Sequence, residues 1–265
     1  MLTWVVTTSR KPASASARET AEWAARLGAR AVPRRGRSLA ELCADEGVDG
    51  ALVLSADRPP TCVSADGALR YYYHPGMALT RIRNLRLGLG DPMVTAMALT
   101  IGDCVLDCTL GRASDALVAS YVVGVAGRVV GIESSPMLAE LTIHGLRSYE
   151  PTKRELAPCF RRIDARRGDH LALLRETPDD GFGVVYLDPL FEEPVESSPA
   201  MAPLRRLADP RPLAAEALAE ACRVAQRCVV IKERTDASLW ERLKVDRVVG
   251  GRGSSIAYGV IVPGG

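Results

Sequence analysis

From Asp103 to the end of the chain, short apolar runs rich in β-branched residues alternate with segments of helical periodicity. This alternation constrains the fold more than any other feature, because strands joined by helices pair in parallel within one sheet. The predicted strands are Cys104–Leu106, Val129–Ile132, Arg162–Ala165, Val184–Leu187, Val229–Lys232, Val245–Val249 and Ser255–Ile261. The predicted helices are Ser114–Val123, Pro136–Ser148, His170–Arg175, Pro212–Ala225 and Ser238–Leu243. We therefore expect an α/β fold with a Rossmann-like, seven-stranded, mostly parallel sheet that ends in an antiparallel hairpin.

A smaller α/β domain is predicted before this sheet, over residues 1–73. Its expected elements are the strand Leu2–Thr7, the helix Glu19–Leu27, the strand Ala29–Val32, the helix Leu39–Glu46, the strand Gly50–Leu54 and a hairpin over residues 62–73. Ser38 and Glu41 have the spacing of a capping box, which sets the start of the second helix. We expect connecting helices over 74–102, one of them begun by Asp91-Pro92, and the large domain over 103–265.

Acidic residues stand at or just after four of the predicted strand ends. They are Asp107, Glu133, Asp169 and Asp188. In a doubly wound sheet, ligands bind outside the carboxyl ends of the strands near the point where the strand order reverses. Glu133 is placed to accept hydrogen bonds from both hydroxyls of a ribose, and Asp169 from the amino group of an adenine, with His170 beside it. These positions predict a site for a cofactor that contains adenosine.

The turn from Asp107 to Ala113 joins the first strand of this sheet to the next helix. Small residues in it, including Thr109 and Gly111, would let a ligand approach the backbone and the helix N-terminus. Two adenosine cofactors compete, a nicotinamide dinucleotide and S-adenosylmethionine. The turn lacks the G-x-G-x-x-G pattern that seats a pyrophosphate, and Asp115 would repel one. An acidic turn suits the cationic end of S-adenosylmethionine.

The predicted strand Val184–Leu187 stops at Asp188-Pro189-Leu190-Phe191. The Asp188 carboxylate and the Pro189 carbonyl oxygen can accept the two N–H bonds of a planar amine, while Phe191 stacks on its ring. The exocyclic amine of a nucleobase is a poor nucleophile because its lone pair is delocalised, and these hydrogen bonds would free it. We therefore predict Asp188, Pro189 and Phe191 as catalytic residues. A structural interpretation stays open for so short a motif, with Asp188-Pro189 ending a strand and Phe191 filling a core.

Four stretches carry a family resemblance. They are Val105–Gly111 with Asp115-Ala116, Gly131–Pro136, Val184–Phe191 and Arg227–Lys232. Residues 103–262 resemble the class I S-adenosylmethionine-dependent methyltransferases, and within them the RsmJ type, which methylates the exocyclic amine of a guanine in small-subunit ribosomal RNA. The resemblance implies S-adenosylmethionine as cofactor and RNA as partner. It places Ser114, Asp115, Glu133, Ser134, Asp169, His170 and Asp188 at cofactor-contacting positions. The family's Gly-Leu-Gly loop reads Gly111-Arg112-Ala113 here.

Charge is unevenly distributed along the 265 residues, although 34 Lys and Arg against 32 Asp and Glu leave a net charge of only +2. Residues 1–37 hold eight basic side chains and two acidic ones. The basic ones are Arg10, Lys11, Arg18, Arg26, Arg30, Arg34, Arg35 and Arg37. A segment of this kind can bind RNA phosphates, and it can equally be a set of solvated helix faces.

The seven cysteines are scattered without a C-x-x-C pair, so we expect reduced thiols, no metal site and a cytoplasmic protein. The longest apolar run, Ala116–Gly127, is too short to span a bilayer.

Three alternatives to ribosomal RNA guanine methylation remain at this point. One is methylation of another amine, in DNA adenine, another RNA or a protein glutamine. The others are a nucleic-acid-binding module without catalysis, favoured by Arg112-Ala113, and a nicotinamide oxidoreductase.

Overall fold

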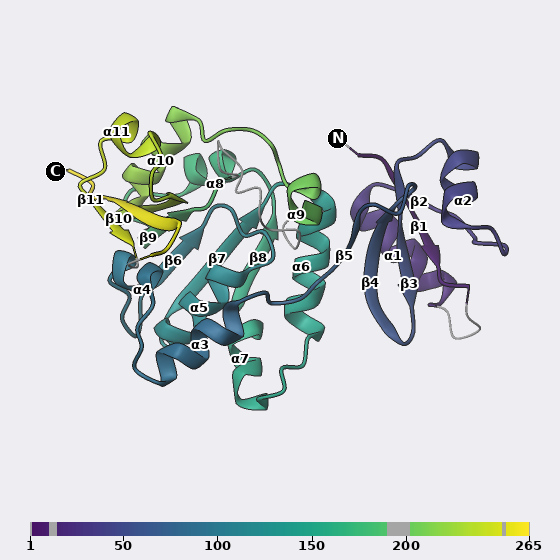
Figure 1. Ribbon diagram of the computed structural model, residues 1–265, viewed down its shortest axis with the longest axis horizontal. Coiled ribbons are helices and arrows are strands. Elements are labelled where there is room, and N and C mark those ends of the chain that lie inside the picture. The colour runs from purple at the N-terminus through teal and green to yellow at the C-terminus, as the bar shows by residue number, and fades with distance from the viewer. Residues whose placement is uncertain (1, 11–14, 190–201, 251–252, 265) are drawn as a thin grey trace.

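The structure is a computed structural model that describes residues 2–10, 15–189, 202–250 and 253–264. It contains two β-sheets, one of five strands and one of seven, which form the cores of a small unit and a large unit (Figure 1). The strands and helices of the small unit end at Tyr72, and those of the large unit begin at Ala78. The expected domain limits at residues 73 and 102 lie in the segments that follow β5 (Arg70–Tyr72) and α4 (Pro92–Met97).

The seven-stranded sheet has the strand order β11-β12-β10-β9-β6-β7-β8. Its strands are β6 (Cys104–Asp107), β7 (Arg128–Glu133), β8 (Ile163–Arg167), β9 (Phe182–Leu187), β10 (Ala225–Arg234), β11 (Arg247–Gly250) and β12 (Ile256–Ile261). All neighbours pair in parallel except β12, which pairs antiparallel with both β10 and β11. The chain runs from β6 outward through β7 and β8 and then returns to β9 on the other side of β6. The reversal point therefore lies between β6 and β9, and the predicted sheet is confirmed.

Alternating side chains of each strand enter two different cores, as the two-residue period of a strand requires. Val105 and Val184 face a core closed by α3 (Ala78–Arg86), α4, α5 (Ser114–Val123) and α7 (Ala157–Arg161). Leu106 and Val185 face the opposite core, closed by α8 (His170–Glu176), α10 (Ala215–Val224) and α11 (Leu239–Leu243). The sheet is thus covered on both faces, and its ligands are confined to the edge where the strands end.

The small unit has the strand order β2-β1-β3-β4-β5. Its elements are β1 (Trp4–Thr8), α1 (Ala17–Leu27), β2 (Arg30–Ala31), α2 (Leu39–Glu46), β3 (Gly50–Ser55), β4 (Arg58–Ser64) and β5. The parallel pairing of β1 with both β2 and β3 confirms the expected β-α-β-α-β arrangement, and β4 adds the antiparallel hairpin. Ser38 and Glu41 form the predicted capping box at the start of α2.

The two units meet at α6 (Pro136–Ser148), which lies between them in Figure 1. Trp23 of α1 is buried, and its ring lies 5.3 Å from the ring of His144. Gly145 leaves room for the ring of Tyr73, since a Cβ at that position would lie 2.0 Å from a ring atom. The short helix α9 (Ala202–Leu207) adds Leu204 and Leu207 to the same shared core.

Several element limits differ from the prediction. Strand β4 begins at Arg58 rather than Cys62, although Pro59-Pro60 argues against a strand. The prolines are tolerated because β5 pairs with β4 only from Thr61 onward, so the start of β4 has a neighbouring strand on one side alone. Strand β10 begins at Ala225, four residues early, through an irregularity between Ala225 and Cys228. Helix α10 begins at Ala215 rather than at Pro212. The 3-10 turn η1 (Arg154–Leu156), α7 and α9 were not expected, because their short apolar spacings give no clear helical period.

Candidate active site

The predicted catalytic loop follows β9, beside the reversal point of the sheet. Asp107 ends β6 and pairs in register with Tyr186 of β9, so Asp107 and Asp188 end neighbouring strands. The hydroxyl oxygen of Thr109 accepts a hydrogen bond from the Asp188 N–H at 2.6 Å. Asp188, with Pro189 next to it in the chain, therefore lies against the turn that follows β6, as the strand-end argument requires. Phe191 falls outside the described residues.

A network of charged side chains connects this loop to α5. Lys232 of β10 donates to the Asp188 carboxylate at 2.7 Å and to the Asp115 carboxylate at 3.1 Å. Asp115 also accepts from the Tyr186 hydroxyl at 3.0 Å and from the Arg81 guanidinium. Their side chains are 10% to 26% exposed, so these charges interact with little screening by water.

Burial and mutual repulsion set the ionisation of these acids. Burial raises the pKa of Asp188, and Lys232 partly opposes the shift. Burial also raises the pKa of Asp107 well above its usual range, with Asp115 and Asp188 adding to the rise. At Asp115 the effect of burial is overcome by Lys232 and Arg81, which hold its pKa below the ordinary value. Burial alone would lower the pKa of Lys232. The carboxylates of Asp115 and Asp188 raise this pKa instead, so the lysine keeps its charge.

The network carries more acids than bases. Arg81 also donates to Asp91, at 2.7 and 2.9 Å. The carboxyl groups of Asp91, Asp107, Asp115 and Asp188 thus share two cations, Arg81 and Lys232. Its formal excess of negative charge favours a cationic ligand at this end of the sheet and disfavours a pyrophosphate.

The turn between β6 and α5 is held by Glu133, the last residue of β7. Its carboxylate accepts from the Gly111 N–H at 2.9 Å and from the Ser135 N–H at 2.8 Å. The Thr142 hydroxyl donates to the Gly111 carbonyl oxygen at 2.7 Å, which fixes the other side of the turn. Ala113, where the family has glycine, adopts a left-handed conformation with φ of 61°. The turn therefore keeps its glycine-like backbone without the glycine.

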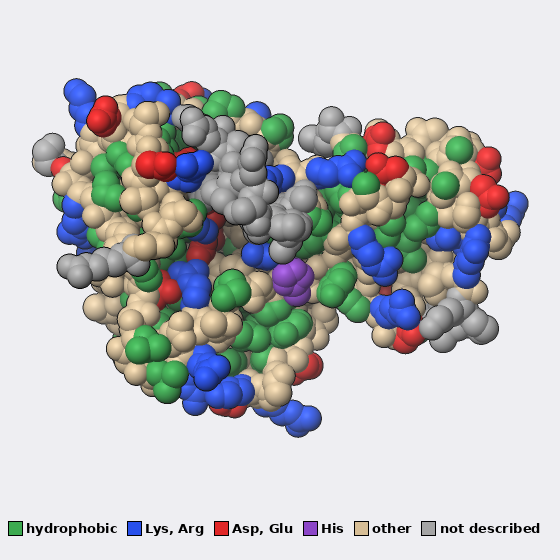
Figure 2. Space-filling view, in the orientation of Figure 1, with side chains coloured by type: hydrophobic (Ala, Val, Ile, Leu, Met, Phe, Trp, Pro, Cys, Tyr) green, Lys and Arg blue, Asp and Glu red, His purple; other side chains and the backbone are tan. Residues whose placement is uncertain are grey.

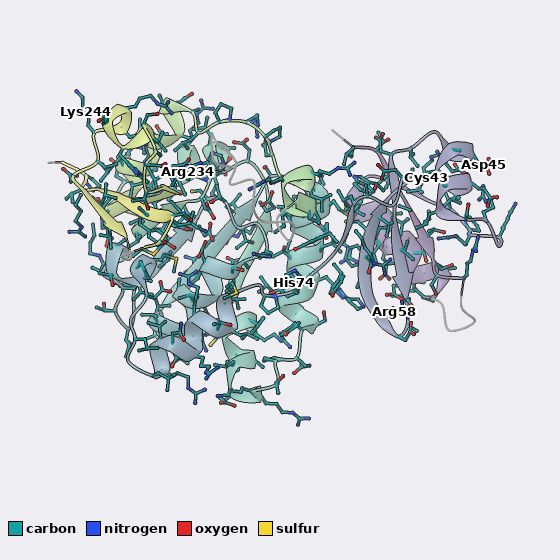
Figure 3. The ribbon with its side chains drawn as sticks, in the orientation of Figure 1. Cys43, Asp45, Arg58, His74, Arg234 and Lys244 are labelled. Carbon is teal, nitrogen blue, oxygen red and sulfur yellow. The ribbon has the colours of Figure 1, made fainter. Side chains whose placement is uncertain are left out.

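Two further predicted residues make other contacts. The Ser114 hydroxyl donates to the Pro75 carbonyl oxygen at 2.9 Å, in the His74-Pro75-Gly76 segment that joins the two units. His74 is visible at this junction in Figure 3. The Ser134 hydroxyl donates to Asp209 at 3.1 Å. Each of these two serines connects the candidate cofactor region to a segment outside the core of the sheet.

Asp169 caps the N-terminus of α8, because its carboxylate accepts from the Leu171 N–H at 2.9 Å. Its other oxygen accepts from Arg211 at 3.0 Å. His170 is partly buried beside it, and burial lowers the pKa of its imidazole. The predicted adenine acceptor is thus at the expected strand end, with Arg211 bound to it.

The sequence interpretation missed several members of the site. Lys232 was noted only as a strand-end residue, and its pairing with Asp188 and Asp115 joins positions far apart in the chain. Arg81, Tyr186, Asp209 and Arg211 were not assigned to this site. Only the apolar strand pattern around Tyr186 hinted that its hydroxyl needs a buried partner.

Within the described ranges, no group of three or more His, Cys, Asp or Glu is arranged to hold a metal ion. The helices of those ranges include none that is long and apolar enough to cross a membrane.

Comparisons with known proteins identify the family and the fold. The family described as "Putative SAM-dependent methyltransferase" matches residues 64–254. Uncharacterized protein YpiP of Bacillus subtilis (strain 168) is 40% identical over 192 residues, which are 72% of this chain and 74% of that protein. Ribosomal RNA small subunit methyltransferase J of Ectopseudomonas mendocina (strain ymp) is 29% identical over 247 residues, 90% of this chain and 88% of that protein. The crystal structure of a SAM-dependent methyltransferase from Neisseria gonorrhoeae shares the fold, with a TM-score of 0.64 at 18% identity over 98% of this chain and 96% of that one.

Proposed function

Since this chain belongs to the family of S-adenosylmethionine-dependent methyltransferases, we propose that it methylates the exocyclic amine of a nucleobase, namely a guanine of small-subunit ribosomal RNA. The similarity to a ribosomal RNA small subunit methyltransferase over most of both chains supports the choice of RNA. The observation that carries the choice of an amine is the position of Asp188 and Pro189 at the reversal point of the sheet, fixed against Thr109.

The residues at the carboxyl end of the sheet fit S-adenosylmethionine. Each oxygen of Glu133 accepts one backbone N–H and keeps a second lone pair, with which it can accept a ribose hydroxyl. Asp169 supplies an acceptor for the adenine amino group once Arg211 releases the carboxylate oxygen to which it is bound. Asp107 and Asp115 make the far end of the site acidic, which suits a sulfonium and an ammonium group. Bound there, the cofactor supplies an electrophilic methyl group that needs no further activation.

Asp188 makes the main contact with the target amine that the protein itself must supply. Its bond to Lys232 leaves it free lone pairs, because a carboxylate has about four acceptor positions. One of them accepts an N–H of the target amine, and the Pro189 carbonyl oxygen accepts the other. These hydrogen bonds strengthen as the nitrogen becomes tetrahedral, so they stabilise the transition state more than the bound substrate.

Lys232 determines how basic this acceptor is. It opposes the rise that burial causes in the pKa of Asp188, and it withdraws electron density from the carboxylate. Asp188 therefore accepts a hydrogen bond without having to remove a proton before methyl transfer, since the positively charged product nitrogen loses its proton readily. The target base must leave its stack to reach a carboxylate that lies at the end of a covered sheet.

The test is transfer of a labelled methyl group from S-adenosylmethionine to isolated small ribosomal subunits, followed by digestion and identification of the labelled nucleoside. We expect a guanosine methylated on its exocyclic nitrogen. Parallel reactions with DNA and with protein substrates give the other outcomes. Label that appears only in adenine of DNA or in glutamine would overturn the RNA assignment, and label on a carbon or an oxygen would overturn the amine assignment.

A further inference from the structure

A surface hollow of about 530 Å³ lies beside β2, the edge strand of the small unit. Arg30, Arg35, Arg37 and Glu46 supply its charged lining. In Figure 1, β2 and α2 lie on the side of the small unit that faces away from the large sheet, so the hollow is separate from the candidate active site. Nothing in the proposed chemistry uses it.

The arginines here are brought together by backbone oxygens. Arg34 and Arg10 both donate from Nε to the Arg37 carbonyl oxygen, at 2.6 and 3.0 Å. Arg37 donates to the Pro33 carbonyl oxygen at 3.0 Å. A carbonyl oxygen orients a guanidinium but cancels none of its charge, so these like charges repel one another. The pKa of Arg34 reflects this, because burial and then Arg10 and Arg37 lower it.

Carboxylates neutralise only part of this charge. Glu46 pairs with Arg30 at 2.7 Å, and Asp45, visible on α2 in Figure 3, pairs with Arg37 at 2.8 Å. Glu41 is engaged in the capping box of α2. Five arginines (Arg10, Arg30, Arg34, Arg35 and Arg37, the arginine cluster) thus face three carboxylates, which leaves an excess of two positive charges.

We propose that the arginine cluster binds the phosphate backbone of RNA. Guanidinium groups donate two parallel N–H bonds to a phosphate, and an anion would relieve the repulsion within the cluster. Arg10, Arg30 and Arg35 are exposed, and Figure 2 shows Lys and Arg side chains over the visible face of the small unit. This inference rests on the proposed function, because it treats the RNA that is methylated as the RNA that is bound.

The local backbone argues against a small free phosphate as the occupant. A compact phosphate site uses the backbone N–H groups at a helix N-terminus. At α2 two of these groups are already taken, because Ser38 accepts from the Glu41 N–H and Glu41 accepts from the Ser38 N–H. The hollow therefore offers an anion chiefly the arginine side chains of an open surface, which suits a polymer with repeated charges.

The experiment compares RNA binding by the whole protein and by a triple variant, Arg10→Gln with Arg30→Gln and Arg35→Gln. Binding of a fluorescent single-stranded RNA is measured across a range of salt. If each arginine meets one phosphate, the log–log salt slope becomes shallower by about 2, and affinity in dilute salt falls roughly tenfold or more. The matched control is Arg18→Gln with Arg58→Gln and Arg128→Gln, three arginines that are 57% to 89% exposed and lie outside the cluster. The control should keep the slope and affinity of the parent.

Further arms separate the outcomes. The corresponding triple Arg→Lys variant should keep the salt slope, because it keeps the charges. Millimolar inorganic phosphate should displace little RNA; strong displacement would show a small-anion site instead and overturn the proposal. A triple Gln variant that binds RNA as the parent does would also overturn it. Binding of S-adenosylmethionine and transfer of the label are measured in the same experiment. If methylation fails while RNA binding still depends on the arginine cluster, the failure of the proposed function is recognised as a separate result.

Discussion

The two units concentrate opposite charges and hold them in opposite ways. In the large unit, Asp115 and Asp188 are largely buried and are bonded to the side chains of Lys232 and Arg81. In the small unit, Arg10 is exposed and bonded to a backbone oxygen. Charges of the first kind depend on one another, because each would be costly to bury alone. Charges of the second kind depend little on one another for stability and remain available to a partner.

This difference matches the two ligands that we propose. An excess of acids under a covered sheet suits a small cationic cofactor, and an excess of arginines on an open surface suits a polyanion. It also gives opposite expectations for mutagenesis. Removing the cation that two buried acids share in the large unit should affect folding strongly, whereas neutralising an arginine of the cluster should affect RNA binding and leave folding nearly unchanged.

The largest effect on stability is expected for Lys232→Met. It leaves Asp115 and Asp188 without their shared cation, so we expect a loss of roughly 3 kcal/mol in the free energy of unfolding near neutral pH. The matched control is Lys153→Met, at an exposed lysine, which should change stability by less than about 0.5 kcal/mol. Denaturant unfolding of the two variants measures both.

The same variant gives a pH dependence of defined sign. Burial already raises the pKa of Asp188 with Lys232 present, and removing the cation raises it further. The folded variant then binds protons more readily than its unfolded chain, so its free energy of unfolding rises as the pH falls. We expect the deficit of Lys232→Met relative to the parent to shrink between pH 8 and pH 5. A deficit that grows on acidification would contradict the pairing of Lys232 with these acids.

A smaller effect is expected at Glu133, and it concerns the affinity for the cofactor rather than stability. Glu133→Ala should weaken S-adenosylmethionine by roughly 1.5 to 3 kcal/mol, because two charge-assisted hydrogen bonds to the ribose are lost. Calorimetric titration measures this loss. Glu140→Ala is the control, a buried glutamate of α6 that holds no part of the turn. An unchanged dissociation constant in a folded Glu133→Ala protein would remove Glu133 from the cofactor site.

The smallest effect is expected at Ala113. Glycine there relieves the left-handed strain of φ 61° but loses a buried methyl group, so Ala113→Gly should change stability by less than about 1 kcal/mol. Ala116→Gly, at a buried position inside α5, has no strain to relieve. It should therefore be less stable than Ala113→Gly by about 1 to 2 kcal/mol. Equal losses would show that Ala113 stores no strain in the turn.

Much of the fold follows from local patterns. Asp91 at the N-cap and Pro92 at the first position start α4, and Ser38 with Glu41 starts α2, because caps satisfy N–H groups within one turn of chain. The parallel strands were predictable because apolar runs of that length, separated by helices, have few other ways to bury both faces. The early start of β10 at Ala225 was not predictable, because the polar Gln226 and Arg227 lie in an irregularity of the strand, and only the pairing of Ala225 with Phe182 of β9 extends β10 to that point.

Only the acidic residues of the site were predictable from the sequence. Its acids could be found because each follows a strand, and parallel strands bring their carboxyl ends to one edge. Their cations could not, since Arg81 reaches Asp115 from a helix before the sheet and Lys232 reaches it from a strand near the other end of the chain. No local pattern reports which carboxylate a distant lysine will meet, because that contact is set by strand order.

The rate of methyl transfer by Asp188→Asn tests the central claim most directly. Asparagine keeps the size and one acceptor oxygen but loses the charge, so a carboxylate that only ends a strand should tolerate it. The protein is saturated with S-adenosylmethionine and supplied with small ribosomal subunits, and Asp164→Asn, at a partly exposed acid of β8, is the control. We expect turnover to fall by a factor on the order of 100 or more in Asp188→Asn, with cofactor binding and the thermal melt close to those of the parent. A folded, saturated Asp188→Asn protein that methylates at the parent rate would contradict the account.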